Sequence, residues 1–165
     1  MRLVALQKHI YPRSFGGLME QRLGTVTSAV TAQVRTAEDV PPTPLPAELR
    51  YEVSDPYAVV LTLGPSTDWA VTWVFARALL TEGLRRPTGA GDVTVVPAPR
   101  HHRRRHHPRS VRVVLRNGSG QALVGLAVGD VAAFLRKTFA LVPAGAEGYH
   151  VDLDGVITAL MGRNL

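Results

Sequence analysis

The chain has 165 residues, 45% of them apolar and 19% charged, which is typical of one ordinary globular domain. It contains no cysteine, which excludes disulfides, thiolate nucleophiles, zinc–thiolate centres and iron–sulfur clusters. The formal net charge of +6 favours an anionic partner such as nucleic acid, a membrane surface or a wall polymer. No apolar run reaches the roughly 18 residues of a membrane span, so we expect a cytoplasmic protein without a transmembrane segment.

The first half of the chain is rich in strand patterns. Residues 1–24 are irregular and are interpreted as an N-terminal extension. From Thr25 to Val34, apolar and polar residues alternate with the period of a half-buried strand. The prolines of segment 41–46 predict a stiff linker, because proline fixes φ and lacks an N–H donor. Short strands are expected at 49–53 and 58–63.

Aromatic residues mark the next strand. Trp69, Val71, Trp73 and Phe75 alternate, which predicts that they share one face and that the two tryptophans lie side by side. Such a face is either part of the core, the interpretation we favour, or an exposed platform for stacking bases. A short helix is expected over 76–82, ending at a left-handed Gly83.

The second half of the chain combines a hairpin with helices. Asn117-Gly118-Ser119-Gly120 predicts a hairpin turn. Apolar residues from Val131 to Val142 recur at helical spacing, and Pro143 and Gly145 close that helix. The remaining elements expected are strands at 92–96, 111–115 and 121–127 and a last helix at 152–161. Strand hairpins followed by helices indicate an α+β fold with a mainly antiparallel sheet.

Two short strings resemble catalytic or cofactor motifs. Asp152-Leu153-Asp154-Gly155 resembles the opening of haloacid-dehalogenase-type phosphatases, but too few residues follow it to supply the groups that hold Mg²⁺ and phosphate. We interpret these aspartates as caps of the last helix. Gly89-Ala90-Gly91 lacks the third glycine of a dinucleotide fingerprint and is interpreted as a turn. No catalytic residue, metal site or cofactor is predicted.

The most unusual segment is a basic loop insert at 98–110. Residues 93–129 contain seven arginines and no acid, so this stretch carries +7 and the rest of the chain −1. The loop is interpreted either as a solvated hairpin tip, which we favour, or as a clamp for a polyanion. Its spaced histidines, His102 and His106, are a poor metal site because arginines surround them. The candidate polyanion ligands are Arg100, Arg103, Arg104, Arg105 and Arg109.

The middle of the chain resembles a known family. Asp55-Pro56-Tyr57-Ala58-Val59, Trp73-Val74-Phe75-Ala76-Arg77, Glu82-Gly83-Leu84 and Arg86-Pro87-Thr88-Gly89 carry the likeness, with Gly91-Asp92-Val93 after them. They resemble the SsgA-like sporulation and cell-division proteins of actinobacteria, whose GC-rich genomes also account for the preference for arginine over lysine. The resemblance covers about residues 25–160, and we expect one such domain over 25–162.

This resemblance implies a non-enzymatic protein of the sporulation septum, which recruits division machinery or controls septal wall synthesis. It also implies a strongly bent antiparallel sheet of about six to seven strands with flanking helices, similar to the Whirly-type single-strand nucleic-acid binders, and assembly as a trimer. Partners implied are the tubulin-like GTPase FtsZ, wall-synthesis proteins or another family member. The residues carried over as motif and interaction candidates are Tyr57, Trp73, Phe75, Arg77, Glu82, Pro87, Gly89, Gly91 and Asp92.

Two departures from the family pattern qualify the carry-over. The basic loop is normally less basic in the family, and Ala78 stands where the family commonly has Asp.

The alternative hypothesis is a single-stranded nucleic-acid-binding module that uses the Whirly-like fold and the Arg/His loop. A third hypothesis is contact of the same loop with wall polymer or a membrane surface.

Overall fold

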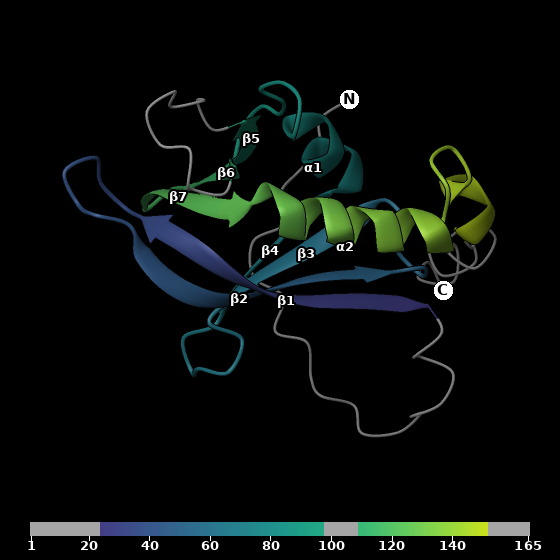
Figure 1. Ribbon diagram of the computed structural model, residues 1–165, viewed down its shortest axis with the longest axis horizontal. Helices are drawn as coiled ribbons and strands as arrows, with labels where there is room; N and C mark the ends of the chain where they lie inside the picture. Colours follow the sequence, from purple (N-terminus) through teal and green to yellow (C-terminus); the bar gives the residue numbers. More distant parts are fainter. Residues whose placement is uncertain (1–23, 98–108, 152–165) are drawn as a thin grey trace, which may run out of the picture.

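The structure, a computed structural model, describes residues 24–97 and 109–151. These residues form seven strands, two α-helices and a short 3-10 helix (Figure 1). In chain order the strands are β1 (Thr25–Arg35), β2 (Thr43–Glu52), β3 (Ala58–Leu63), β4 (Val71–Ala76), β5 (Val93–Pro97), β6 (Ser110–Asn117) and β7 (Gly120–Ala127). The helices are α1 (Arg77–Gly83), α2 (Val128–Leu141) and η1 (Glu147–His150).

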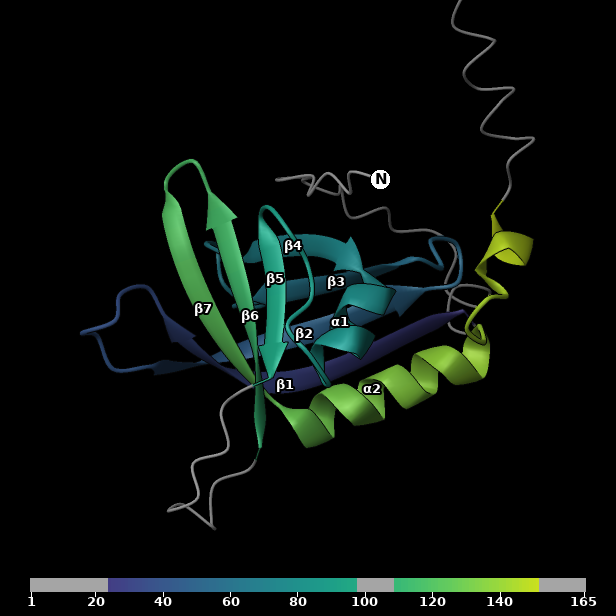
Figure 2. The same cartoon turned by 90° about the horizontal axis from the view of Figure 1, so that it is seen from above.

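All seven strands belong to one antiparallel sheet with the order β4-β3-β2-β1-β7-β6-β5. The sheet bends at β1, because β1 pairs with β2 from Thr25 to Val34 but with β7 only from Gln33 to Arg35. Figure 2 shows the consequence: β5, β6 and β7 run across the direction of β1 to β4. The predicted α+β fold with a strongly bent antiparallel sheet is confirmed.

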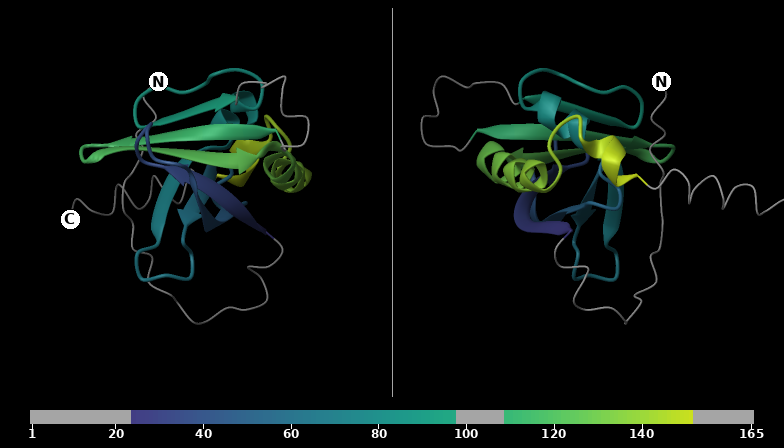
Figure 3. Two further views of the ribbon diagram at one scale, coloured as in Figure 1. Left: turned by 60° about the vertical axis from the view of Figure 1, so that its left-hand side comes forward. Right: turned by 90° about the vertical axis from the view of Figure 1, so that its right-hand side faces the viewer.

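Each part of the sheet ends in a helix that follows its last strand directly. β4 continues into α1 at Ala76, and β7 continues into α2 at Ala127. Both alanines have extended backbone angles, with φ and ψ of −64° and 135° at Ala76 and −65° and 129° at Ala127. Both helices therefore turn back onto the concave side of the sheet, as the two end-on views in Figure 3 show for α2.

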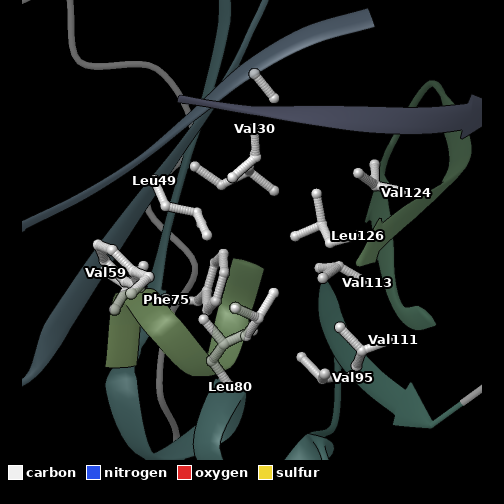
Figure 4. Packing of buried hydrophobic residues seen from close by; sticks show 14 of the residues in the cluster. Val30, Leu49, Val59, Phe75, Leu80, Val95, Val111, Val113, Val124 and Leu126 are labelled. Atoms are coloured by element: carbon white, nitrogen blue, oxygen red, sulfur yellow. The ribbon is translucent and has the colours of Figure 1, made fainter. Parts of the chain in front are cut away.

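The core lies between the two parts of the sheet and the helices. Alternate residues of each strand face it, for example Val59, Leu61 and Leu63 in β3. Figure 4 shows side chains of β1 to β4 facing those of β5 to β7, with Leu80 of α1 between them. Each fully buried Val or Leu contributes about 1.5–3 kcal/mol. We call this side the inner face and the opposite side the outer face.

The prediction of a proline linker over 41–46 is wrong for its second half. Pro44 and Pro46 lie within β2, opposite Gln33 and Thr31 of β1. The carbonyl of Pro46 accepts a 2.8 Å hydrogen bond from the N–H of Gly64, so it points away from β1. A proline at such a position removes no hydrogen bond from the β1–β2 ladder, and both residues precede the stretch that pairs with β3. Proline is tolerated here because this first stretch of β2, unlike the stretch from Ala47 onward, pairs only with β1.

Gly83 is needed for a different reason from the one predicted. It is the last residue of α1 and does not adopt a left-handed φ. Instead, a Cβ atom at this position would overlap the side chain of Val95 in β5. The missing side chain therefore lets α1 pack directly on β5.

The hairpin and the long helix are confirmed. β6 and β7 are joined at Gly118-Ser119, and the Asn117 side chain accepts a 2.9 Å hydrogen bond from the N–H of Ser119. α2 buries its apolar stripe against β1 and β7. The expected extension at 1–24, except Gly24, and the expected last helix at 152–161 lie outside the described residues.

Candidate functional site

Among the motif residues, Arg77 is the most buried and the most connected. It is the first residue of α1, and its backbone N–H donates a 2.7 Å hydrogen bond to the carbonyl of Tyr57. Its side chain is only 2% exposed. One guanidinium nitrogen donates to two carbonyls at the end of α2, those of Thr138 at 3.3 Å and Val142 at 2.8 Å. A cation at the carboxyl end of a helix satisfies free carbonyls and complements the helix dipole.

The same guanidinium contacts an acid and two aromatic rings. Its other terminal nitrogen lies 2.6 Å from Oε1 of Glu147, 70 residues later in the chain. Its central carbon lies 4.9 Å from the ring centre of Tyr51 and 4.2 Å from that of Phe139, within the range of cation–π attraction. Arg77 thus joins α1, β2, α2 and the turn at η1 in one cluster.

The cluster changes the acidity of two of its members. Hydrogen bonds from the backbone N–H of Glu147 itself, from Arg77 and from the N–H of Gly145 lower the pKa of the Glu147 carboxyl, against an opposing effect of burial. Burial raises the pKa of the Tyr51 phenol, and the positive charge of Arg77 partly opposes that shift. The carboxylate is therefore held ionised opposite Arg77, as a structural ion pair requires.

The aromatic motif residues also belong to the interior. Phe75 is 6% exposed, pairs with Val59 and is part of the core. Trp73 is half-buried and packs against the core. Trp69 is not in the strand, so the prediction that the two tryptophans lie side by side along it is wrong; the side chain of Trp69 lies in the turn before β4, close to Gly64. The favoured interpretation of this face as core is confirmed for Trp73 and Phe75.

The remaining motif residues lie on the surface, mostly in the connection between α1 and β5. Two backbone hydrogen bonds between Thr88 and Val95 hold this connection against the edge of the sheet. We call residues 84–92 the α1–β5 loop. Its motif members are Pro87, Gly89, Gly91 and Asp92, all of them exposed. The half-buried Glu82 lies just before it, in the last turn of α1.

Several contacts fix the shape of this loop. Glu82 accepts hydrogen bonds from the guanidinium of Arg86, and the Asp92 carbonyl accepts one of 2.8 Å from the N–H of Arg116. Gly89 has a φ of 109°, and a Cβ there would lie 2.5 Å from the carbonyl oxygen of Val93. Glycine is thus required at position 89 for both backbone conformation and space. The loop is an ordered surface rather than a free connection.

Tyr57 forms a second exposed motif position. Its side chain is 55% exposed, and its hydroxyl lies close to Gly148 in η1. Tyr149, in the same short helix, is 90% exposed. Tyr57 therefore lies over the Arg77 cluster and faces solvent.

Of the predicted polyanion ligands, the structure describes only Arg109, which is exposed just before β6. Arg100, Arg103, Arg104 and Arg105 lie outside the described residues. The sequence pattern did not reveal Glu147 or Phe139 as partners of Arg77. No spacing rule connects residues so far apart, and an arginine at the start of a helix is usually exposed.

Comparison with known proteins agrees with the motif. Residues 45–147 match the family described as "Streptomyces sporulation and cell division protein, SsgA". The chain is 42% identical over 121 residues to the sporulation-specific cell division protein SsgB of Streptomyces coelicolor, covering 73% of this chain and 85% of that protein. The chain belongs to the SsgA family of sporulation and cell-division proteins.

Solved structures of SsgA-family members have the same fold. An SsgA-like sporulation-specific cell division protein from Thermobifida fusca superposes with a TM-score of 0.70 at 37% identity, covering 84% of this chain and 97% of that one. A structure of SsgB gives a TM-score of 0.68 at 39% identity, covering 76% and 94%. In the described part of this SsgA-family chain, no helix is long and apolar enough to span a membrane.

Proposed function

We propose that this protein is a non-enzymatic component of the sporulation division machinery that acts at the septum. The observation that carries the proposal is its similarity to SsgB over most of both chains, because SsgB is a sporulation-specific cell division protein. Mutations in SsgB correlate to longitudinal cell division during sporulation of Streptomyces coelicolor. A protein whose alteration changes the plane of division acts on where or how the septum is built.

The arrangement of the motif residues supports a role in binding rather than in chemistry. Phe75 and Arg77 are buried and stabilise the core, so their side chains are not accessible to a partner. The α1–β5 loop, in contrast, is exposed and fixed in shape by the contacts of Gly89 and Asp92. A surface of fixed shape loses little conformational entropy on binding, so we assign partner recognition to this loop.

The proposed partners are proteins of division or wall synthesis at the septum. They are FtsZ, a wall-synthesis protein or another SsgA-family member, as the family resemblance implies. We also propose that the chain assembles as a homotrimer. Size-exclusion chromatography with light scattering tests the trimer, and a monomer at micromolar concentration contradicts it.

The septal role is tested in a sporulating host that carries a deletion of the gene. A fluorescently tagged copy is expected to concentrate at sporulation septa, and the deletion is expected to impair septation or septum placement. Even distribution of the tagged copy together with normal septa and spores in the deletion strain contradicts the proposal.

A further inference from the structure

The outer face of β5, β6 and β7 carries arginines around an aliphatic centre. On β6, inner residues such as Val113 face the core, so Arg112, Val114 and Arg116 face outward. In register with Val114, the neighbouring strands place Leu123 of β7 and, beyond it, Arg35 of β1. We call the surface formed by Arg35, Arg112 and Arg116 around Val114 and Leu123 the arginine face.

Neither of the two helices covers the arginine face. Both helices pack on the inner face, where Leu80 and Phe134 join the core. In Figure 2, β7, β6 and β5 lie side by side with neither helix crossing them. Val114, at the centre of the arginine face, is only 9% exposed. Arg35, Arg112 and Leu123 are partly exposed and Arg116 is exposed, so this side of the sheet presents mainly its arginines to solvent.

Charge on the outer face differs between the two parts of the sheet. In the first part, Arg50 of β2 forms an ion pair with Glu52. Among the described residues, neither Arg35, at the end of β1 beside β7, nor Arg112 of β6 has an ion pair or a side-chain hydrogen bond, and the Nε atom of Arg35 is buried without a partner. Opposite charges on neighbouring strands stabilise a sheet, and in the described part of the chain these three arginines have no acid as an ion-pair partner, which leaves a positively charged surface suited to an external anion.

The nearest acid is Asp92, which precedes β5 in register with Arg116. It contributes its backbone carbonyl to the N–H of Arg116, and no ion pair joins its carboxylate to that arginine among the described residues. The Arg116 guanidinium instead donates to Gln121 at 2.9 Å and to Thr94 at 3.3 Å, which holds it across three strands. The arginine face is therefore continuous with the α1–β5 loop.

One outward position beside Arg112 carries no side chain. Gly125 of β7 is its cross-strand neighbour and faces outward in the middle of a strand, where glycine weakens the sheet. A Cβ atom at Gly125 would meet only Gln33, at 3.5 and 3.6 Å, so packing within the sheet does not require glycine here. A glycine that folding does not need is typical of a place where a ligand backbone approaches closely.

We infer that the arginine face binds an extended, acidic segment of a partner protein, whose carboxylates pair with the arginines and whose backbone passes over Gly125. Arg112 and Arg116 are four residues apart on one strand, about 13 Å, which matches carboxylates four residues apart on an extended peptide. Leu123, which is partly exposed beside the buried Val114, offers an apolar contact to a small side chain of such a segment. The inference rests on the proposed function in one respect, since the partner that carries the acidic segment is taken to be a division protein.

The composition of the face favours a peptide over single-stranded nucleic acid. Sites that bind single strands without sequence preference rely on aromatic side chains on which bases stack. Among the described residues of the arginine face and its outward neighbours, including Thr94, Val96 and Gln121, none is aromatic. Nucleic acid is therefore the alternative outcome of the test.

The test measures binding of fluorescein-labelled (Glu-Val)6 to the purified full chain by anisotropy in 50 mM salt, with (Lys-Val)6 and dT12 as comparison probes. We expect saturable binding of (Glu-Val)6 and none of (Lys-Val)6. Arg35→Gln, Arg112→Gln and Arg116→Gln should each weaken it about tenfold, the loss expected for one charge-assisted hydrogen bond. Arg50→Gln, on the same side of the sheet but paired with Glu52, is the matched control and should leave binding unchanged.

Gly125→Val adds a side chain opposite Arg112 without altering charge, and so tests whether a peptide backbone passes over this position. Because valine favours strands and its Cβ fits beside Gln33, we expect an unchanged or raised melting temperature together with binding weakened about tenfold or more. Tighter binding of dT12 than of (Glu-Val)6, binding that survives all three arginine changes, or binding lost only when Arg100, Arg103, Arg104 and Arg105 are changed to Gln would each overturn the inference. This experiment uses purified protein, so its failure leaves the septal role, tested by localisation, unaffected.

Discussion

Arg77 at the start of α1 and Val142 just after the end of α2 are joined by a 2.8 Å hydrogen bond from the guanidinium to the carbonyl. The bond connects the helix that ends the first part of the sheet with the helix that ends the second. Together with the ion pair to Glu147 and the contacts with the rings of Tyr51 and Phe139, this bond gives the part of the family motif around Phe75 and Arg77 a structural role. We propose that partner binding falls to the exposed residues of the motif.

Replacing Arg77 is expected to destabilise the fold strongly. Arg77→Met removes the donors to two buried carbonyls and leaves Glu147 without its cation, so we expect the free energy of unfolding to fall by about 2–4 kcal/mol. Urea denaturation followed by circular dichroism measures it. Arg136→Met, an exposed change in α2, is the control and should stay within about 0.5 kcal/mol of wild type. Equal stability of the two variants contradicts the structural role of Arg77.

Glu147 is expected to make stability depend on pH in the acid range. Its pKa in the folded state lies below the value of 4.5 for an unperturbed glutamate, so its contribution is present above that value and is lost as the pH falls through the folded-state pKa. Asp55 acts in the opposite direction, because burial raises its pKa. The comparison is therefore made between wild type and Glu147→Gln, whose difference in unfolding free energy should shrink as the pH falls below about 4.5. A difference that stays constant from pH 7 to pH 3 contradicts this role.

Gly83 and Gly129 give a matched pair of helix substitutions. Gly83→Ala forces a methyl group into the side chain of Val95 and should cost about 1–3 kcal/mol, although alanine favours helices. Gly129→Ala, in the first turn of α2, has open space around its Cβ and should stabilise by up to about 1 kcal/mol. Thermal unfolding by calorimetry distinguishes the two. A stabilising Gly83→Ala would contradict the packing of α1 on β5.

Local patterns in the sequence predicted much of the fold. Alternation identified β1 and β3, the Asn-Gly turn identified the β6–β7 hairpin, and helical spacing identified α2. Each of these signals arises within about a dozen residues, which is the range over which periodicity and turn chemistry act. The proline segment misled because the first residues of β2, before Ala47, pair only with β1, and such a stretch tolerates proline, as Pro44 and Pro46 show.

The candidate site was less predictable because its contacts are long-range. Motif residues looked alike in the sequence, but Arg77 is buried by partners 61 to 70 residues away, whereas Asp92 is exposed. The arginine face arises from β1 and β6, which become neighbours only through β7. The alternation of Arg112, Val114 and Arg116 with core residues on β6 was a usable signal for an outward basic surface, although the charge of the segment was expected in the loop insert.

Substituting the exposed part of the motif is expected to separate partner binding from folding. Pro87→Ala combined with Asp92→Ala changes two exposed side chains of the α1–β5 loop and leaves the Asp92 carbonyl in place for Arg116. We expect a melting temperature within about 3 °C of wild type, because neither side chain contributes to the core. Cross-linking in sporulating cells should recover fewer division proteins with this variant than with Asp68→Ala, an exposed change in the turn before β4. Equal recovery of division proteins with the two variants would show that the partner-binding surface lies outside the α1–β5 loop.

The central claim, that this SsgA-family protein acts at the sporulation septum through the α1–β5 loop, is tested most directly by localisation in the deletion strain. Septal fluorescence is measured for tagged wild type, the Pro87→Ala and Asp92→Ala double variant, and Asp68→Ala at matched expression. The account predicts septal foci for wild type and for Asp68→Ala and diffuse signal for the loop variant. Septal foci of equal intensity for all three proteins would contradict the role of the loop, and diffuse signal for wild type would contradict the septal role itself.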